Sequence, residues 1–238
     1  MTLVFFSCEK EVIDKDSVIK DLVIAPKSSI YADGESRLEI SVKLNVNADI
    51  DKRGVVFTTN DGEFVNGKDG TITKKADFEN GELVAKVQLV VSNSLGIVKI
   101  TAKPEVSSQF VDFVLKDSVT KVTSIPQKIS LHTSSLSVKS GFASEVEIVG
   151  TIKNEFNKNA SSGVKVEFED VFQDLMPVEG RFRVKNSTTG SGSQVSCIYS
   201  PGYVKPHTDI YIKCYILDSL GKRTLKRDSI KINVIKDE

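Results

Sequence analysis

The amino-acid sequence predicts an all-β protein built as two tandem β-sandwiches, and three observations carry that prediction. Apolar and polar residues alternate with a period of two along many short segments, as in strands with one buried face. Turn-forming pairs such as Asp-Gly and Asn-Gly separate these segments, and the order of the first half returns in the second. The 238 residues, 39% of them hydrophobic, suffice for one or two domains that each bury a core.

The clearest strand covers residues 38–44, where four aliphatic side chains alternate with polar ones. Turn signals such as Asp33-Gly34 and Asn80-Gly81 bound this strand and its neighbours. Short strands with a turn about every ten residues are typical of a sandwich or barrel. The other strands of this first series are expected around residues 55–57, 71–73, 83–91, 98–102 and 111–115.

A second series begins after Pro126 and repeats the order of the first. Residues 36–45 followed by 54–57 resemble residues 144–154 followed by 163–168, which indicates two similar units in tandem. No window has the spacing of a convincing amphipathic helix, and the short stretch 168–175 is the only one to consider. The strands of this second series are expected around residues 129–131, 146–152, 164–168, 182–184, 195–199, 210–216 and 230–234.

The break between the two series is expected near Thr120, in a polar, β-branched linker over residues 117–127. This divides the chain into three parts. Residues 1–16 form a truncated lipoprotein signal and a charged tether, residues 17–120 a first domain, and residues 121–238 a second.

The first half resembles a bacterial immunoglobulin-like domain of the invasin and intimin type. The resemblance rests on Tyr31-Ala32-Asp33-Gly34 before an alternating strand, on residues 55–64, and on residues 81–89 with 96–102. It covers roughly residues 20–115 and is weaker over 125–235, where Ser140-Gly141 replaces the Asp-Gly entry. The resemblance implies tandem immunoglobulin-like β-sandwiches that serve as a spacer or adhesive module at a cell surface, although the fold alone does not establish that use.

The N-terminus resembles a lipobox, because Ser7-Cys8 follows the short apolar run 3–6 and precedes charged residues. We therefore expect Cys8 to be lipidated, which would place the protein at the outer membrane as a cell-surface lipoprotein. The apolar run is shorter than that of a normal signal peptide, which indicates a start codon placed too late or a trimmed chain. The alternative is an apolar N-terminus that carries an incidental cysteine.

Four Asp-Ser-apolar tripeptides resemble the sites at which Bacteroides-type bacteria O-glycosylate exported proteins. This resemblance implies glycosylation at four positions: Ser17, Ser118, Ser219 and Ser229. An equally weighted alternative is that Asp-Ser pairs start turns and strands, since both side chains bond to nearby backbone. Together with the lipobox, the tripeptides favour a Bacteroides-like surface lipoprotein.

Two of the three cysteines, Cys197 and Cys214, fall on the inward phase of predicted strands. An exported protein could oxidise this pair to a disulfide. Two buried free thiols that pack as small hydrophobic groups are the favoured alternative.

Few residues point to catalysis or to a metal. His132 and His207 lie far apart without triad or zinc spacing, and both are expected at the surface or at strand ends. The acids of residues 49–51 and 61–63 could bind calcium, but ordinary turn acids fit better because neither segment forms an EF-hand loop. Residues 190–193 are Gly/Ser-rich and precede a strand, which indicates a flexible hairpin loop and not a phosphate cradle. We expect no enzyme, no cofactor and no metal.

The charge and composition of the chain limit the classes of partner that it is expected to bind. The 32 basic and 32 acidic residues give zero formal net charge, so the broad positive field used to bind nucleic acid is missing. An adhesive or spacer lipoprotein, monomeric and anchored by lipid, fits best, with a host or surface protein or a glycan as partner. Contacts are expected from the sandwich-end loops 60–63 and 66–70. The alternative is a glycan-binding lipoprotein beside an outer-membrane uptake system, with four stacking candidates: Tyr199, Tyr203, Tyr211 and Tyr215.

Overall fold

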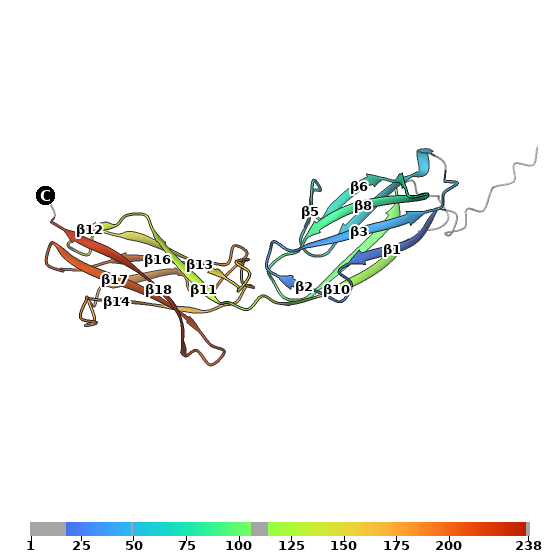
Figure 1. Ribbon diagram of the computed structural model, residues 1–238. Coiled ribbons are helices and arrows are strands. Elements are labelled where there is room, and N and C mark those ends of the chain that lie inside the picture. The colour runs from blue at the N-terminus through green and yellow to red at the C-terminus, as the bar shows by residue number, and fades with distance from the viewer. Residues whose placement is uncertain (1–17, 49, 106–113, 237–238) are drawn as a thin grey trace, which may run out of the picture. The chain divides into compact units, whose positions relative to one another are not determined.

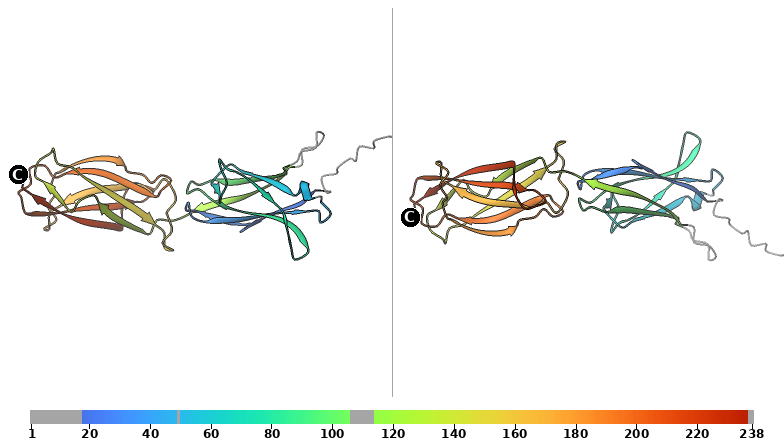
Figure 2. Two further views of the ribbon diagram at one scale, coloured as in Figure 1. Left: turned by 90° about the horizontal axis from the view of Figure 1, so that it is seen from above. Right: turned by 90° about the horizontal axis from the view of Figure 1, so that it is seen from below.

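A computed structural model describes residues 18–48, 50–105 and 114–236. Over these ranges the protein is all-β, and its one helical turn is the short 3₁₀ segment η2 (Ile50–Lys52). The chain divides into two compact units. One ends at Val119, and the other takes Thr120 and the later residues together with segments 29–36 and 91–96. Each sandwich is described by itself, and Figures 1 and 2 show each as two layers of strands.

The first sandwich is formed by β1 to β10. One sheet has the order β1-β3-β8-β5, with β7 also paired to β8, and the other has the order β2-β10-β9-β4-β6. Its strands are β1 (Ile19–Ala25), β2 (Ser29–Ala32), β3 (Arg37–Leu44), β4 (Gly54–Thr59), β5 (Glu63–Phe64), β6 (Thr71–Lys75), β7 (Asp77–Glu79), β8 (Glu82–Val90), β9 (Ile97–Pro104) and β10 (Leu115–Thr123).

The second sandwich is formed by β11 to β18, with sheet orders β11-β13-β16-β15 and β12-β18-β17-β14. Its strands are β11 (Lys128–Thr133), β12 (Ser137–Lys139), β13 (Val146–Lys153), β14 (Val166–Val171), β15 (Arg181–Asn186), β16 (Gln194–Ser200), β17 (Thr208–Leu217) and β18 (Arg223–Ile235).

The two sandwiches share one topology, which confirms the internal repeat. β3 lies between β1 and β8 as β13 lies between β11 and β16, and each second sheet starts with a short parallel pair, β2 with β10 and β12 with β18. Two packed, mainly antiparallel sheets in this order form an immunoglobulin-like sandwich. The halves differ between β4 and β8, where the first sandwich has three short strands and the second has only β15 between β14 and β16.

Period-two alternation places the cores where the sequence predicts them. On β3, Leu38, Ile40, Val42 and Leu44 are buried, while most of the intervening side chains reach solvent. In the second sandwich Ile148 and Ile152 of β13 pack in one cluster with Ile210 and Ile212 of β17. Burying side chains of this size contributes roughly 1.5–3 kcal/mol each, so these rows are the main stabilising element of each sheet pair.

One sequence prediction, the extent of the linker, is wrong in detail. Residues 117–123 belong to β10, so the first half of the predicted linker is a paired strand and only residues 124–127 connect β10 to β11. Residues 168–175, the one stretch considered for a helix, form the end of β14 followed by a turn, in agreement with the all-β prediction. The predicted strand at 111–115 falls largely outside the described residues.

Candidate binding surfaces

Two predicted modification sites, the lipidation site Cys8 and the glycosylation site Ser17, lie outside the described residues. Within the described ranges, no helix has the length and apolar character needed to cross a bilayer. The described part of the chain therefore leaves lipidation as a prediction.

The other three glycosylation candidates are all exposed, but their backbones differ. Ser219 lies in the turn between β17 and β18, where the Asp218 carboxylate accepts hydrogen bonds from the N–H groups of Leu220 and Lys222. Ser118 and Ser229 lie on the paired strands β10 and β18. Ser219 is therefore the one of these three serines that lies outside a paired strand.

Cys197 of β16 and Cys214 of β17 are buried free thiols in the second core. Burial raises the pKa of the Cys197 thiol to about 12. Burial, followed by the charge on Cys197, raises the pKa of Cys214 as well. Both side chains remain protonated and unreactive at neutral pH, since the thiolate is the reactive form.

The four predicted stacking tyrosines do not form one surface. Tyr199 is fully buried, and its hydroxyl donates a 2.9 Å hydrogen bond to Asp170 Oδ2. Tyr215 is buried beneath the guanidinium of Arg223, 4.5 Å from its ring centroid. Tyr211 is half-buried on β17, and Tyr203 is 88% exposed in the loop before β17. Only Tyr203 presents a freely accessible ring.

The residues considered for catalysis lie apart. His132 is exposed on β11 and His207 is exposed just before β17. Asp49 is not among the described residues, and Asp61 belongs to the turn before β5, where Gly62 has a φ of +75°. Within the described ranges no group of three or more His, Cys, Asp or Glu side chains is placed to hold a metal.

Residues 190–193 were predicted to be a flexible hairpin loop, and the last of them is held against the core. Ser193 is fully buried, and its hydroxyl donates to the carbonyl of Ala160. The Ser193 carbonyl also accepts the N–H of Ile152 on β13. Residues 190–193 thus form the loop between β15 and β16 that was predicted, and its last residue is anchored to the core.

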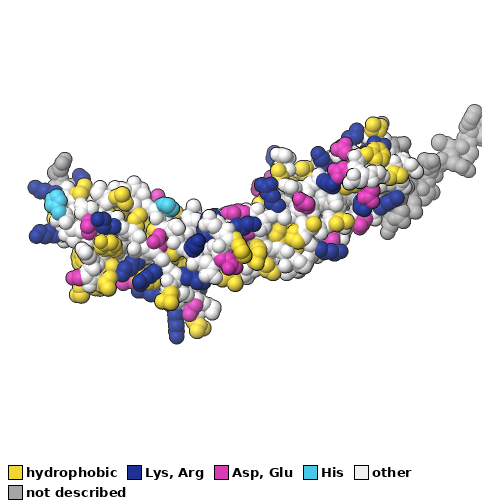
Figure 3. Space-filling model, in the orientation of Figure 1, with side chains coloured by type: hydrophobic (Ala, Val, Ile, Leu, Met, Phe, Trp, Pro, Cys, Tyr) yellow, Lys and Arg dark blue, Asp and Glu magenta, His cyan; other side chains and the backbone are white. Residues whose placement is uncertain are grey.

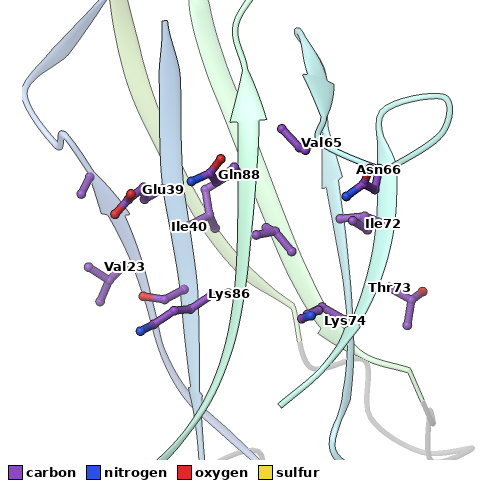
Figure 4. A pocket seen from close by; sticks show the side chains of 13 residues that line it. Val23, Glu39, Ile40, Val65, Asn66, Ile72, Thr73, Lys74, Lys86 and Gln88 are labelled. Atoms are coloured by element: carbon purple, nitrogen blue, oxygen red, sulfur yellow. The ribbon is translucent and has the colours of Figure 1, made fainter. Parts of the chain in front are cut away.

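A hollow of about 770 Å³ lies on the outer face of the first sandwich (Figure 4). The hollow forms because, on one side of β8, the neighbouring strands pair only with its two ends. β5 pairs with one end of β8 and β7 with the other, while β6 between them joins β4 in the opposite sheet. The middle of β8 is thereby left open on that side.

The floor of the hollow consists of two cross-strand rows. Strand register places Ala25, Glu39 and Gln88 in one row and Val23, Ser41 and Lys86 in the other. Figure 4 shows three of the polar side chains, Glu39, Lys86 and Gln88, beside the backbone of β3 and β8. The floor therefore combines an aliphatic edge with a carboxylate, a hydroxyl, an amide and an ammonium group.

The wall of the hollow comes from the segment 65–74. Asn66, Ile72 and Lys74 face the floor across the hollow in Figure 4. Glu39 and Lys74 have no hydrogen-bond or ion-pair partner within the described ranges. The hollow thus brings unpaired polar groups of both signs together.

Of the two loops predicted to make contacts, one is structural and one borders this hollow. In the loop 60–63, the Asn60 amide oxygen accepts the N–H of Lys99 and its Nδ2 donates to the Ile97 carbonyl, which ties the loop to β9. In the loop 66–70, Asn66 adopts a φ of +64° and lines the hollow. Of these two loops, the second borders a concave surface, and contact with a partner stays a prediction for both.

A second concave surface, which we call the end patch, lies on the loops at one end of the second sandwich. It has a volume of about 360 Å³ and is lined by six apolar side chains: Phe142, Phe172, Val178, Pro201, Tyr203 and Val204. The rings of Phe142 and Tyr203 meet edge to face with centroids 5.4 Å apart. This patch was not predicted from the sequence, although large apolar residues in segments outside the alternating pattern were a visible signal.

Solved structures with a similar fold include invasin, described as a bacterial integrin-binding protein. The TM-score is 0.54 at 16% identity, and the match covers 91% of this chain and 39% of that chain. The Yersinia pseudotuberculosis adhesin InvE matches with a TM-score of 0.43 at 13% identity, over 92% of this chain and 60% of that one. The chain thus spans less than two thirds of either protein.

The C-terminal 282-residue fragment of intimin, solved with the intimin-binding domain of the translocated intimin receptor, matches at 17% identity. Its TM-score is 0.31, over 91% of this chain and 64% of that chain. No protein-family model matches the sequence, and no curated protein does either. At these identities the likeness to invasin establishes the immunoglobulin-like fold.

Proposed function

We propose that this protein is a non-catalytic adhesive module of a bacterial cell surface, which binds a protein partner. The observation that carries the proposal is the end patch, where a loop end of an immunoglobulin-like sandwich leaves two aromatic rings exposed. The shared fold with invasin, which is described as integrin-binding, supports the same use. A plain spacer has no need of an exposed aromatic pair.

The chain is further proposed to reach the surface as a lipoprotein of the Bacteroides type, anchored at Cys8 and exposed on the outer membrane. The apolar run before Cys8 and the charged residues after it support this. The test is fatty-acid labelling of the gene product with any upstream start restored. Label on wild type that Cys8→Ser removes supports the anchor, and equal labelling of both contradicts it.

Adhesion is tested with the full chain carrying Cys8→Ser, so that lipid plays no part. The protein is passed over an array of immobilised host-matrix and bacterial surface proteins. Saturable binding to at least one of them is expected, without change to the bound protein. Turnover of any bound protein or glycan, lost on changing a single Asp or Glu, would contradict the non-catalytic reading.

A second candidate function is glycan binding, and the hollow of the first sandwich favours it. Sugars present hydroxyls that donate and accept hydrogen bonds, and the unpaired Glu39 and Lys74 face such a ligand from opposite sides. A glycan array probed with wild type and Glu39→Gln tests this candidate. Glu63→Gln, an exposed acid on β5, is the matched control. Binding that only Glu39→Gln weakens supports it.

A further inference from the structure

The end patch and the turn next to it expose several large apolar side chains of the second sandwich. Tyr203 is 88% and Phe142 48% exposed, and the turn after Phe172 adds Leu175 at 67% and Met176 at 60%. Tyr, Phe and Met are enriched at the centres of protein interfaces, where they fill or form pockets. Three side chains of these types close to one concave surface indicate a docking site.

The backbone holds these side chains outward at an energetic cost. The ring of Phe142 packs on Gly202, where an added Cβ would lie 2.9 Å from the ring, and the Gly141 N–H donates to the Gly202 carbonyl. Leu175 adopts a left-handed φ of +69°, which is unfavourable for a side chain of its size. The turn nevertheless presents that leucine to solvent.

The charge beside the end patch is mainly positive. The Ser140 hydroxyl donates to the Val204 carbonyl, and the Ser140 N–H donates to the Ile235 carbonyl. Lys139, Lys205 and Lys236 directly adjoin these three bonded residues in the chain, so they lie at one edge of the patch. Figure 3 shows Lys or Arg side chains and one histidine gathered at this end of the sandwich.

Among the described residues, the acidic groups near the end patch are fewer than the lysines and lie on a different loop, the one between β14 and β15. Glu179 lines the patch from the segment between β14 and β15, and the Asp174 carboxylate in the same segment accepts the N–H of Met176. The patch therefore has an apolar centre with a basic edge. A partner that complements it carries an apolar side chain with carboxylates beside it.

We infer that the end patch binds an acidic protein segment that inserts one aromatic or aliphatic side chain beside Tyr203 and Phe142, with its carboxylates toward Lys205 and the neighbouring lysines. This inference rests on the proposed adhesive function and names the partner chemistry of that function. The edge-to-face ring pair forms one wall of the pocket, and the lysines set the orientation and accelerate the encounter.

The test is selection of a random peptide library, displayed on phage, on the full chain carrying Cys8→Ser. Enriched peptides should share an aromatic or aliphatic residue flanked by Asp or Glu. Tyr203→Ser should weaken their binding by about tenfold or more, which is the loss of an interface hot spot. Lys205→Glu should weaken binding and reduce its dependence on salt.

Matched controls come from the protruding β17–β18 hairpin of the same sandwich. Leu225, 99% exposed, is changed to Ser, and the exposed Lys222 is changed to Glu. Both controls should leave peptide affinity within about twofold, as expected for surface changes outside the patch. All four variants alter exposed side chains, so circular dichroism should show an unchanged fold.

Several outcomes would overturn the inference. These are a library that yields no binder, binders without the acidic-apolar pattern, and binding that survives Tyr203→Ser. Self-association of the chain that Tyr203→Ser abolishes would reassign the patch to a second copy of the chain. Attachment to anionic phosphatidylglycerol vesicles that Tyr203→Ser abolishes would reassign it to a lipid surface. Surface-protein binding unaffected by Tyr203→Ser would leave the adhesive function standing and refute only the site. Absence of any protein binding would refute the function itself.

Discussion

Replacing Tyr199 with phenylalanine should destabilise the second sandwich by about 2 kcal/mol, because a hydrogen bond to a charged group contributes roughly 1.5–3 kcal/mol. The Tyr199 hydroxyl lies 2.9 Å from Asp170 Oδ2, and both side chains are buried. The Gly180 N–H donates to the same oxygen at 2.8 Å. Phenylalanine keeps the ring contact with Phe182, at 4.9 Å between centroids, so the loss isolates the hydroxyl.

Urea unfolding followed by circular dichroism measures the effect. With an m-value of about 2 kcal/mol per molar, a loss of about 2 kcal/mol lowers the midpoint by about 1 M. Tyr215→Phe is the matched control, because Tyr215 is buried beneath Arg223 and its hydroxyl has no hydrogen-bond partner among the described residues. The control should change stability by no more than about 0.5 kcal/mol.

A double-mutant cycle tests the physical reason. In an Asp170→Ala background the same phenylalanine change should be close to neutral, because the hydroxyl has already lost its acceptor. Gly180→Ala should also destabilise, since its Cβ would lie 2.5 Å from Tyr199 Oη, whereas at Gly190 nothing lies within 4 Å of an added Cβ. Equal midpoints for wild type and Tyr199→Phe, or full additivity in the cycle, would refute the reasoning.

Three further outcomes are expected. The hydrogen bond from Arg223 lowers the pKa of the Glu167 carboxyl below 4.5. The pair therefore stabilises the fold above the pKa that Glu167 has in the unfolded chain, and this stabilisation is lost as pH falls through the lowered pKa. An NMR titration should show that Arg223→Met raises the pKa of Glu167. Both core cysteines of the second sandwich should resist a thiol reagent at pH 8 and react fully after denaturation, whereas a disulfide would leave neither reactive. Fragment 18–124 should unfold cooperatively, and fragment 18–119 should be less stable because it lacks the β10 residues that pair with β2.

Strand positions could be predicted wherever every inward residue is aliphatic. Residues 38–44 were predicted and Arg37–Leu44 is observed. β10 was predicted as a linker because Lys121 occupies one of its inward positions. That lysine is buried and its ammonium donates to the Ser92 hydroxyl at 2.9 Å. A buried polar residue is tolerated at an inward position of a strand when it is hydrogen-bonded, but it interrupts the apolar–polar alternation by which the strand is recognised in the sequence.

The remaining gaps have two physical causes. The short strands β2 and β12 pair in parallel with strands far along the chain, so no local periodicity marks them. The end patch collects residues from three loops between different strand pairs, such as Phe142, Phe172 and Tyr203, and only the folded topology brings them together. Apolar residues could be found in those loops from the sequence, but their common surface could not.

Attachment of bacteria that display the whole chain tests the adhesive account most directly. A non-adherent strain carrying the displayed chain is compared under flow with the same strain carrying an empty vector, on a layer of cultured epithelial cells. The account predicts stronger attachment for the strain that displays the chain and loss of this gain with Tyr203→Ser. Because the Tyr203 side chain is exposed, this substitution should leave the fold intact. Equal attachment of the displaying and empty strains would contradict it.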